Sequence, residues 1–167
     1  MDWVSLRLGF TLLLEKFARW LYRGQRQNAV ARVLNRGAAA LFARGIAPDY
    51  LVTLQVTGRR SGRTISLPLV MLVLDRERYL VSNLGADVAW VQNVKAADGQ
   101  AVLRHGRTEK VRLEELPIGE RPRVLKAYLR WAPGARPHVP VDKDAPFEEF
   151  EAIAARFPVF RVPVGRS

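Results

Sequence analysis

Residues 51–74 read LVTLQVTGRRSGRTISLPLVMLVL, and this stretch decides the fold class. Residues 51–57 and 64–74 are short apolar runs rich in β-branched side chains, a composition typical of β-strands. Between them, residues 58–63 begin with one glycine and contain a second, which indicates a tight turn. The pair therefore predicts a β-hairpin, and it marks the point where the helical period of the preceding residues ends.

The strand pattern continues to the end of the chain, with short helices between strands. We predict further strands at 79–84, 100–105, 107–116 and 159–164, with Gly106 as the turn of a hairpin. We predict helices at 87–97 with Asp87 as N-cap, at 118–131 and at 147–156, and a proline-rich loop at 133–146. Six strands with few helices between them indicate an antiparallel barrel and not alternating βαβ units.

Two stretches before the barrel, 3–23 and 28–43, have the helical period. The first has an apolar face with two Trp and two Phe, and Lys16, Arg19 and Arg23 lie on its other side. This composition predicts a helix at an anionic membrane surface, while packing on the barrel or on a partner subunit is the alternative. No linker separates the parts, so we predict one domain over 1–167, with helices in 1–45 and the barrel core in 50–167.

The composition excludes several classes of protein. The chain has no cysteine and two histidines, His105 and His138, which excludes disulfides and thiolate sites and argues against a metal site. The 27 Lys and Arg exceed the 16 Asp and Glu, for a net charge of +11, which indicates an anionic partner. Nucleic acid is not expected, because the aromatic residues gather in residues 3–23 instead of alternating with basic ones. The expected location is the cytoplasm, alternatively the inner face of the membrane.

The turn at residues 58–63, GRRSGR, is the first candidate site. Its two glycines would free backbone N–H groups for close approach to an anion, and Ser61 adds a hydroxyl donor. Arg59 and Arg60 offer charge-assisted contacts to phosphate or carboxylate. The alternative interpretation is a solvated hairpin turn that happens to be basic.

The second candidate site is the segment 82–96, SNLGADVAWVQNVKA. A strand ends there, Gly85 allows a tight turn, and a helix begins with free N–H donors, an arrangement suited to an electron-rich ring or an anionic group. Trp90 and Asn93 lie three residues apart and share a helix face. The alternative is that Trp90 fills the core and Asn93 fixes backbone.

Taken together, these segments resemble the deazaflavin-dependent nitroreductase and quinone reductase family. The likeness runs over about residues 51–116, with a further part at 157–162. It rests on TGRRSG, Pro68-Leu69, Ser82, Gly85-Ala86, Trp90 and Asn93-Val94-Lys95-Ala96 in this order. The resemblance implies an α+β, mainly antiparallel fold: a split β-barrel of the flavin-reductase type with N-terminal and peripheral helices.

The resemblance also implies a cofactor, coenzyme F-420, an 8-hydroxy-5-deazaflavin with a phosphate and oligoglutamate tail. Carried over by position, the tail-binding loop matches Arg59, Arg60 and Ser61, and the segment along the ring matches Pro68 and Leu69. The ring-edge contacts match Ser82 and Asn83, and the helix contacts match Trp90 and Asn93. Ser82 is the candidate catalytic residue, as a donor that stabilises charge on the ring or the substrate.

We therefore expect an oxidoreductase that transfers hydride from reduced coenzyme F-420 to a quinone-like or nitroaromatic acceptor, a small hydrophobic substrate. No acid, base or nucleophile of the chain stands out, which is typical of an enzyme that leaves the chemistry to a cofactor. One alternative is the same fold binding a fatty acid or another lipid-like ligand without reductase activity. Another is a split barrel that binds FMN. The oligomeric state stays open.

Overall fold

The computed structural model describes residues 37 and 50–163, so the helix predicted at 3–23, and all but Gly37 of the one predicted at 28–43, lie outside the described residues. The strands are β1 (Leu51–Thr57), β2 (Thr64–Leu74), β3 (Glu77–Val81), β4 (Gln100–His105), β5 (Arg107–Arg112), β6 (Glu114–Glu115) and β7 (Val159–Val162). The helices are α3 (Ala89–Ala96), α4 (Arg121–Trp131) and α5 (Phe147–Ile153), and the 3₁₀ turns are η1 (Ile118–Glu120), η2 (Pro133–His138) and η3 (Ala154–Arg156).

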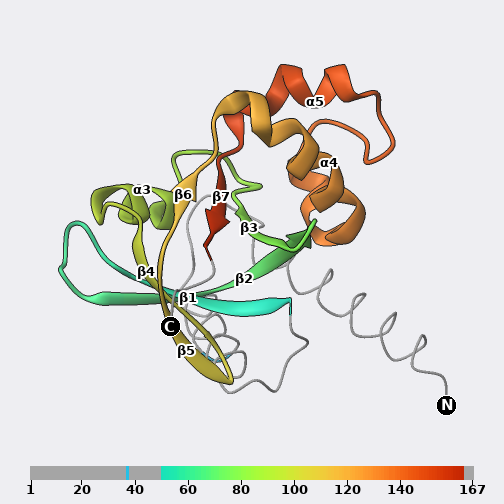
Figure 1. Ribbon diagram of the computed structural model, residues 1–167. Coiled ribbons are helices and arrows are strands. Elements are labelled where there is room, and N and C mark those ends of the chain that lie inside the picture. The colour runs from blue at the N-terminus through green and yellow to red at the C-terminus, as the bar shows by residue number, and fades with distance from the viewer. Residues whose placement is uncertain (1–36, 38–49, 164–167) are drawn as a thin grey trace, which may run out of the picture.

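All seven strands belong to one antiparallel sheet in the order β5-β4-β1-β2-β3-β7-β6. Two segments change partner along their length. Residues 64–70 of β2 pair with β1, while residues 71–74 pair with β3. Likewise β5 pairs with β4, and β6, which follows almost at once, pairs with β7 at the other end of the sheet. The sheet therefore curls into a nearly closed barrel (Figure 1), as the sequence predicted.

An ion pair also joins strands that are not neighbours in the sheet. The Arg78 guanidinium of β3 donates to both carboxylate oxygens of Glu109 in β5, at 2.8 and 2.7 Å, and to the Pro163 carbonyl at 2.9 Å. Hydrogen bonding to Glu109 raises the pKa of Arg78. Because both side chains are largely shielded from water, this bidentate pair fixes how β5, at one edge of the sheet, lies relative to β3.

The prediction of one continuous strand at 107–116 is wrong. The chain bends at Leu113, and the segment divides into β5 and β6. The Leu113 amide donates to the Gly99 carbonyl at 2.8 Å. A Cβ on Gly99 would lie 2.3 Å from the Leu113 oxygen, and its φ is +78°. Close backbone approach at this glycine therefore places the bend, and Leu113 itself is buried.

The second hairpin turns earlier than predicted. Asp75 and Arg76 both have positive φ, 52° and 67°, and form the turn alone, so β3 begins at Glu77 instead of residue 79. Its pairing with β7 ends at Val81 because the Ser82 amide still donates to the Pro158 carbonyl, whereas Pro158 has no N–H to donate in return. The predicted helix at 87–97 is α3, but its N-cap is Val88, without a side-chain hydrogen bond, so the predicted Asp87 cap is wrong.

The remaining elements lie close to their predicted ranges. The helix predicted at 118–131 begins as the 3₁₀ turn η1 and continues as α4, and the one predicted at 147–156 is α5 followed by η3. The proline-rich stretch 133–146 contains η2, which sequence reasoning missed. The last strand ends at Val162, and residue 164 lies outside the described part.

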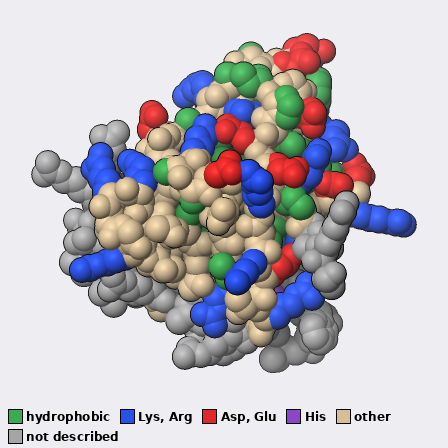
Figure 2. Space-filling model, turned by 60° about the vertical axis from the view of Figure 1, so that its left-hand side comes forward, with side chains coloured by type: hydrophobic (Ala, Val, Ile, Leu, Met, Phe, Trp, Pro, Cys, Tyr) green, Lys and Arg blue, Asp and Glu red, His purple; other side chains and the backbone are tan. Residues whose placement is uncertain are grey.

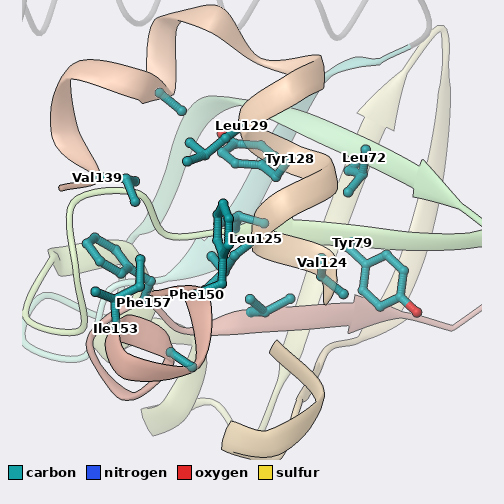
Figure 3. Packing of buried hydrophobic residues seen from close by; sticks show 14 of the residues in the cluster. Leu72, Tyr79, Val124, Leu125, Tyr128, Leu129, Val139, Phe150, Ile153 and Phe157 are labelled. Atoms are coloured by element: carbon teal, nitrogen blue, oxygen red, sulfur yellow. The ribbon is translucent and has the colours of Figure 1, made fainter. Parts of the chain in front are cut away.

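Two apolar cores lie on opposite faces of the sheet. The inner core fills the barrel with alternate residues of its strands, such as Leu54 and Leu80, and α3 adds Val91 and Val94. The outer core lies between the other face of β2 and β3 and the helices α4 and α5, which cover the side away from α3 (Figures 1 and 3). Tyr79 and Phe150 are among its fully buried side chains. The helix α3 is thereby fixed by the barrel interior.

Candidate functional site

The structure joins the two segments singled out in the sequence. The Oδ1 atom of Asn93, in α3, accepts hydrogen bonds from the Arg59 backbone N–H at 3.2 Å and from Arg59 Nη1 at 3.1 Å. Asn93 is 2% exposed, because the neighbouring Val91 and Val94 pack in the barrel. The basic turn between β1 and β2 is therefore attached to α3 through one buried amide.

The turn is closed by its own hydrogen bonds. The Gly58 N–H donates to the Arg63 carbonyl and the Gly62 N–H to the Gly58 carbonyl, both at 2.8 Å. The Arg63 N–H donates to Ser61 Oγ at 3.3 Å. The N–H groups of the two glycines themselves are therefore used inside the turn. In the described part of the chain, the turn amides without a partner are those of Arg60 and Ser61.

The structure of the turn requires glycine at both position 58 and position 62. Gly62 has a φ of +65°, which a side chain adopts only with strain. A Cβ on Gly58 would lie 2.8 Å from Ser61 Oγ and 2.9 Å from Ile65 Cδ1. The glycines thus make the turn compact, and the charged side chains around it are turned to solvent.

The turn is strongly basic and open to water. Arg59, Arg60, Ser61 and Arg63 are all exposed. Figure 2 brings this side of the molecule forward and shows Lys and Arg side chains at its left edge, below, and also among the acidic side chains of its upper part. Such a surface attracts anions from solution.

The loop that leads into α3 is closed on itself. Ser82 is 1% exposed, and its Oγ donates to the Gly85 carbonyl at 2.6 Å. Gly85 has a φ of +94°. Asn83, next in the chain, is half-buried. The predicted ring-edge residues therefore lie at a tight turn just before the helix, with the Ser82 hydroxyl already engaged.

Trp90 and Asn93 share the face of α3 that meets the barrel, as their spacing predicts. The Trp90 ring lies 5.4 Å from the Phe160 ring between centroids, at 57°, and packs against the inner core. It remains half-buried, so part of the ring is accessible. The geometry thus includes the core contact for Trp90 and the backbone bond for Asn93 that the alternative interpretation described.

Pro68 and Leu69 lie on opposite faces of β2. Leu69 packs against the inner core, whereas Pro68 points to the other side and is opposite Thr53 of β1. This half of β2 has only β1 as its neighbour within residues 50–163, which suits a proline that offers no N–H. Only one of the two side chains can therefore face a given ligand.

The histidines and acidic residues give no second site. Burial lowers the pKa of His138, at the end of η2. The Nδ1 atom of His105 lies 2.9 Å from the Leu51 carbonyl. The described residues contain no group of three potential metal ligands of the Asp, Glu, His or Cys type. Their helices include none that is both long and apolar enough to span a bilayer.

Two features escaped the sequence reasoning. Arg63 is an exposed arginine of the same turn, and only its position in GRRSGR could have indicated it. Arg121, at the start of α4, is 7% exposed and donates to the Leu116 carbonyl, the Ala154 carbonyl and Glu115. The sequence of a helix does not show whether a single arginine in it will be buried.

No protein-family model and no curated protein matches the chain. Solved structures do. A protein described as a domain-swapped dimer is 21% identical, with a TM-score of 0.51, over 80% of this chain and 93% of that one. A putative 5-nitroimidazole antibiotic resistance protein from Bacteroides thetaiotaomicron is 11% identical, with a TM-score of 0.50, over 78% and 80%. An F420-H2 dependent reductase is 24% identical, with a TM-score of 0.46, over 69% and 95%.

At these identities the likeness concerns the fold. Together with the sheet order and the two strand segments that change partner, the likeness to the first two of these structures establishes the fold expected from the sequence. The chain has a split β-barrel, seven antiparallel strands in a nearly closed barrel with a few peripheral helices.

Proposed function

We propose that this protein is a deazaflavin-dependent oxidoreductase that transfers hydride from reduced coenzyme F-420 to a quinone-like or nitroaromatic acceptor. The observation that carries the proposal is the contact between Arg59 and Asn93. The family resemblance matches the turn at residues 58–63 to the cofactor tail, and it matches the start of α3 to the ring. The contact between Arg59 and Asn93 joins these two segments. Two segments 34 residues apart are thus parts of one surface.

The turn suits the tail of this cofactor. A phosphate and several carboxylates need N–H donors and positive charge, and the turn offers the amides of Arg60 and Ser61 together with exposed guanidinium groups. Because these groups are in water, their attraction for the tail weakens with salt. We expect the turn to hold the cofactor and to take no part in the chemistry.

Residues at the start of α3 would orient the ring. The accessible part of Trp90 offers an apolar surface, and its contact with Phe160 fixes the indole in one position. Ser82 stays the proposed donor, although its hydroxyl can reach a bound group only by leaving the Gly85 carbonyl. When bound, reduced coenzyme F-420 supplies the hydride. The chain would supply position and hydrogen bonds.

The packing of the inner core argues against a lipid ligand within the barrel. Leu54, Leu80 and Val91 are 0% exposed and occupy the interior themselves. A fatty acid would have to displace them, at a cost of several kcal/mol for the packing that is lost. FMN carries one phosphate and no carboxylate tail, so it would use fewer of the donors in the turn.

A fluorescence titration of the full chain with oxidised coenzyme F-420, and separately with FMN, tests the proposal. Micromolar or tighter binding of coenzyme F-420 supports it, and reduced coenzyme F-420 should then be oxidised in the presence of a soluble quinone or nitroaromatic compound. Ser82→Ala should slow this oxidation by a larger factor than it raises the Kd for the cofactor. Binding of FMN alone, or of neither compound, contradicts the proposed cofactor.

A further inference from the structure

We propose that the arginines of the turn have different tasks: Asn93 holds Arg59 as a structural anchor, and Arg60 and Arg63 contact the anionic group of the ligand. This inference deepens the proposed function and rests on it for the identity of the ligand. It makes Asn93 a positioning residue, not a ligand contact. It also adds Arg63 to the binding residues.

Asn93 has its acceptor oxygen fully used by the protein. Oδ1 accepts two hydrogen bonds from Arg59, one from the backbone and one from the side chain. With 2% of its surface exposed, Asn93 offers a ligand almost no contact area. A buried amide oxygen with two donors is a satisfied group, and it fixes those donors in place.

Arg59 is fixed at both its backbone and its side chain. Its guanidinium bonds to a buried atom of α3, and its N–H bonds to the same atom. Turning this guanidinium toward an anion would leave the Asn93 oxygen with one donor fewer. Arg59 thus determines where the next residues of the turn lie, because its backbone is attached to the core.

Arg60 and Arg63 differ from Arg59 in having no ion pair or hydrogen bond from their side chains to any described residue. The N–H groups of Arg60 and Ser61 are also without partners in this part of the chain. Two free guanidinium groups and two free amides on one compact turn form a site for phosphate or carboxylate. The Ser61 oxygen is occupied by the Arg63 N–H, which keeps the turn closed.

Four variants of the full chain test this division. Arg60→Gln and Arg63→Gln should each raise the Kd for coenzyme F-420 about tenfold, the value of one charge-assisted hydrogen bond. Arg59→Gln should raise it less, because the backbone bond to Asn93 remains. Arg76→Gln removes the same charge from the β2–β3 turn at the opposite end of β2, and it should leave the Kd unchanged.

Asn93 is tested by a pair of substitutions. Asn93→Leu removes the acceptor and should weaken binding of coenzyme F-420, while binding of the deazaflavin riboside, which lacks the tail, stays the same. Asn93→Asp keeps an acceptor for Arg59 and should restore binding of the tail. Both variants are compared at temperatures below their melting transitions, so that only folded protein is measured. Equal loss for both ligands in Asn93→Leu would make Asn93 a general structural residue and overturn its assignment.

Inorganic phosphate separates this inference from the proposed cofactor. In ¹⁵N spectra, phosphate should shift the amide signals of Arg60 and Ser61, and the shifts should disappear in the Arg60→Gln, Arg63→Gln double variant. That result supports the anion site even if coenzyme F-420 does not bind at all. The inference is overturned if phosphate moves neither amide, or if Arg59→Gln costs as much affinity as the other two changes.

Discussion

Replacing Arg121 by methionine should destabilise the protein far more than any surface arginine does. The Arg121 side chain is 8% exposed. Its Nε donates to the Leu116 carbonyl at 2.9 Å, Nη2 donates to Glu115 at 3.0 Å, and Nη1 donates to the Ala154 carbonyl at 3.4 Å. These bonds join the start of α4 to the end of β6 and to η3. Methionine can fill much of the same space but offers no donor.

The two shorter bonds set the size of the effect. A hydrogen bond to a charged group contributes about 1.5–3 kcal/mol, and a buried acceptor left without its donor carries a penalty of similar size. We therefore expect Arg121→Met to lower the free energy of unfolding by about 3–5 kcal/mol. For a chain of this length the melting temperature should fall by roughly 6–20 °C.

Thermal and urea unfolding followed by circular dichroism measure both quantities. The control is Arg123→Met, two residues along α4, where the side chain is 57% exposed and pairs with Asp75 at the surface. An exposed ion pair contributes about 0–1 kcal/mol, so this variant should melt close to the wild type. If Arg121→Met lost no more than Arg123→Met, the guanidinium would contribute nothing beyond packing, and the reasoning from its buried acceptors would be refuted.

Three further predictions concern other parts of the chain. Gly99→Ala should prevent folding, because a Cβ would lie 2.3 Å from the Leu113 oxygen. Gly62→Ala has open space around it and should lower the free energy of unfolding by only about 1–2 kcal/mol, as thermal melts of the two variants would show. Burial lowers the pKa of His138, so the folded state disfavours the charged ring. Stability should then decline as the pH falls below the unfolded value of 6.5 toward the lowered folded value, and His138→Gln should flatten that decline in urea titrations at several pH values. The full chain should sediment with anionic vesicles, and changing Lys16, Arg19 and Arg23 to Gln should weaken this binding roughly 100-fold at about 1 kcal/mol per cation; equal binding would contradict a membrane role for residues 3–23.

The sequence was most informative where local chemistry decides the structure. The bounds of β1 and β2 agree with their predicted ranges, because glycines begin and interrupt the turn between them and apolar runs lie on either side. Gly106, with a φ of +66°, likewise forms the predicted hairpin turn. In each case the residue type alone restricts the backbone, so no knowledge of distant residues is needed.

Boundaries that depend on distant partners were predicted less well. The bend at Leu113 is placed by the Gly99 carbonyl, and the end of β3 is placed by Pro158, which lies far along the chain and has no N–H to donate. No local pattern contains these contacts. Asp87 has the composition of an N-cap, but α3 begins two residues later, where packing of Val91 and Val94 in the barrel decides its position.

The same distinction applies to the candidate site. Residue types identified the basic turn and the helix as important, but not which donor meets which acceptor. Asn93 was predicted to contact a cofactor, and the structure directs its oxygen to Arg59. Backbone N–H groups of the turn were expected to be open to an anion, and the turn uses those of its two glycines internally. A sequence can indicate that a segment binds anions, while the assignment of individual atoms requires the tertiary fold.

The structure also separates residues that hold the fold from residues that shape the site. The helix α3 is linked to Arg121 through Glu115, whose carboxylate lies 3.0 Å from both Lys95 Nζ and Arg121 Nη2. Lys95 is 43% exposed, so this ion pair contributes little to the position of α3. Packing in the inner core and the hydrogen bond to Arg59 determine the position of α3 instead. Among residues 50–163, Arg121 and Asn93 share no hydrogen-bond partner. Loss of Arg121 should therefore reduce the fraction of folded protein without changing the affinity of the turn, whereas loss of Asn93 should change that affinity.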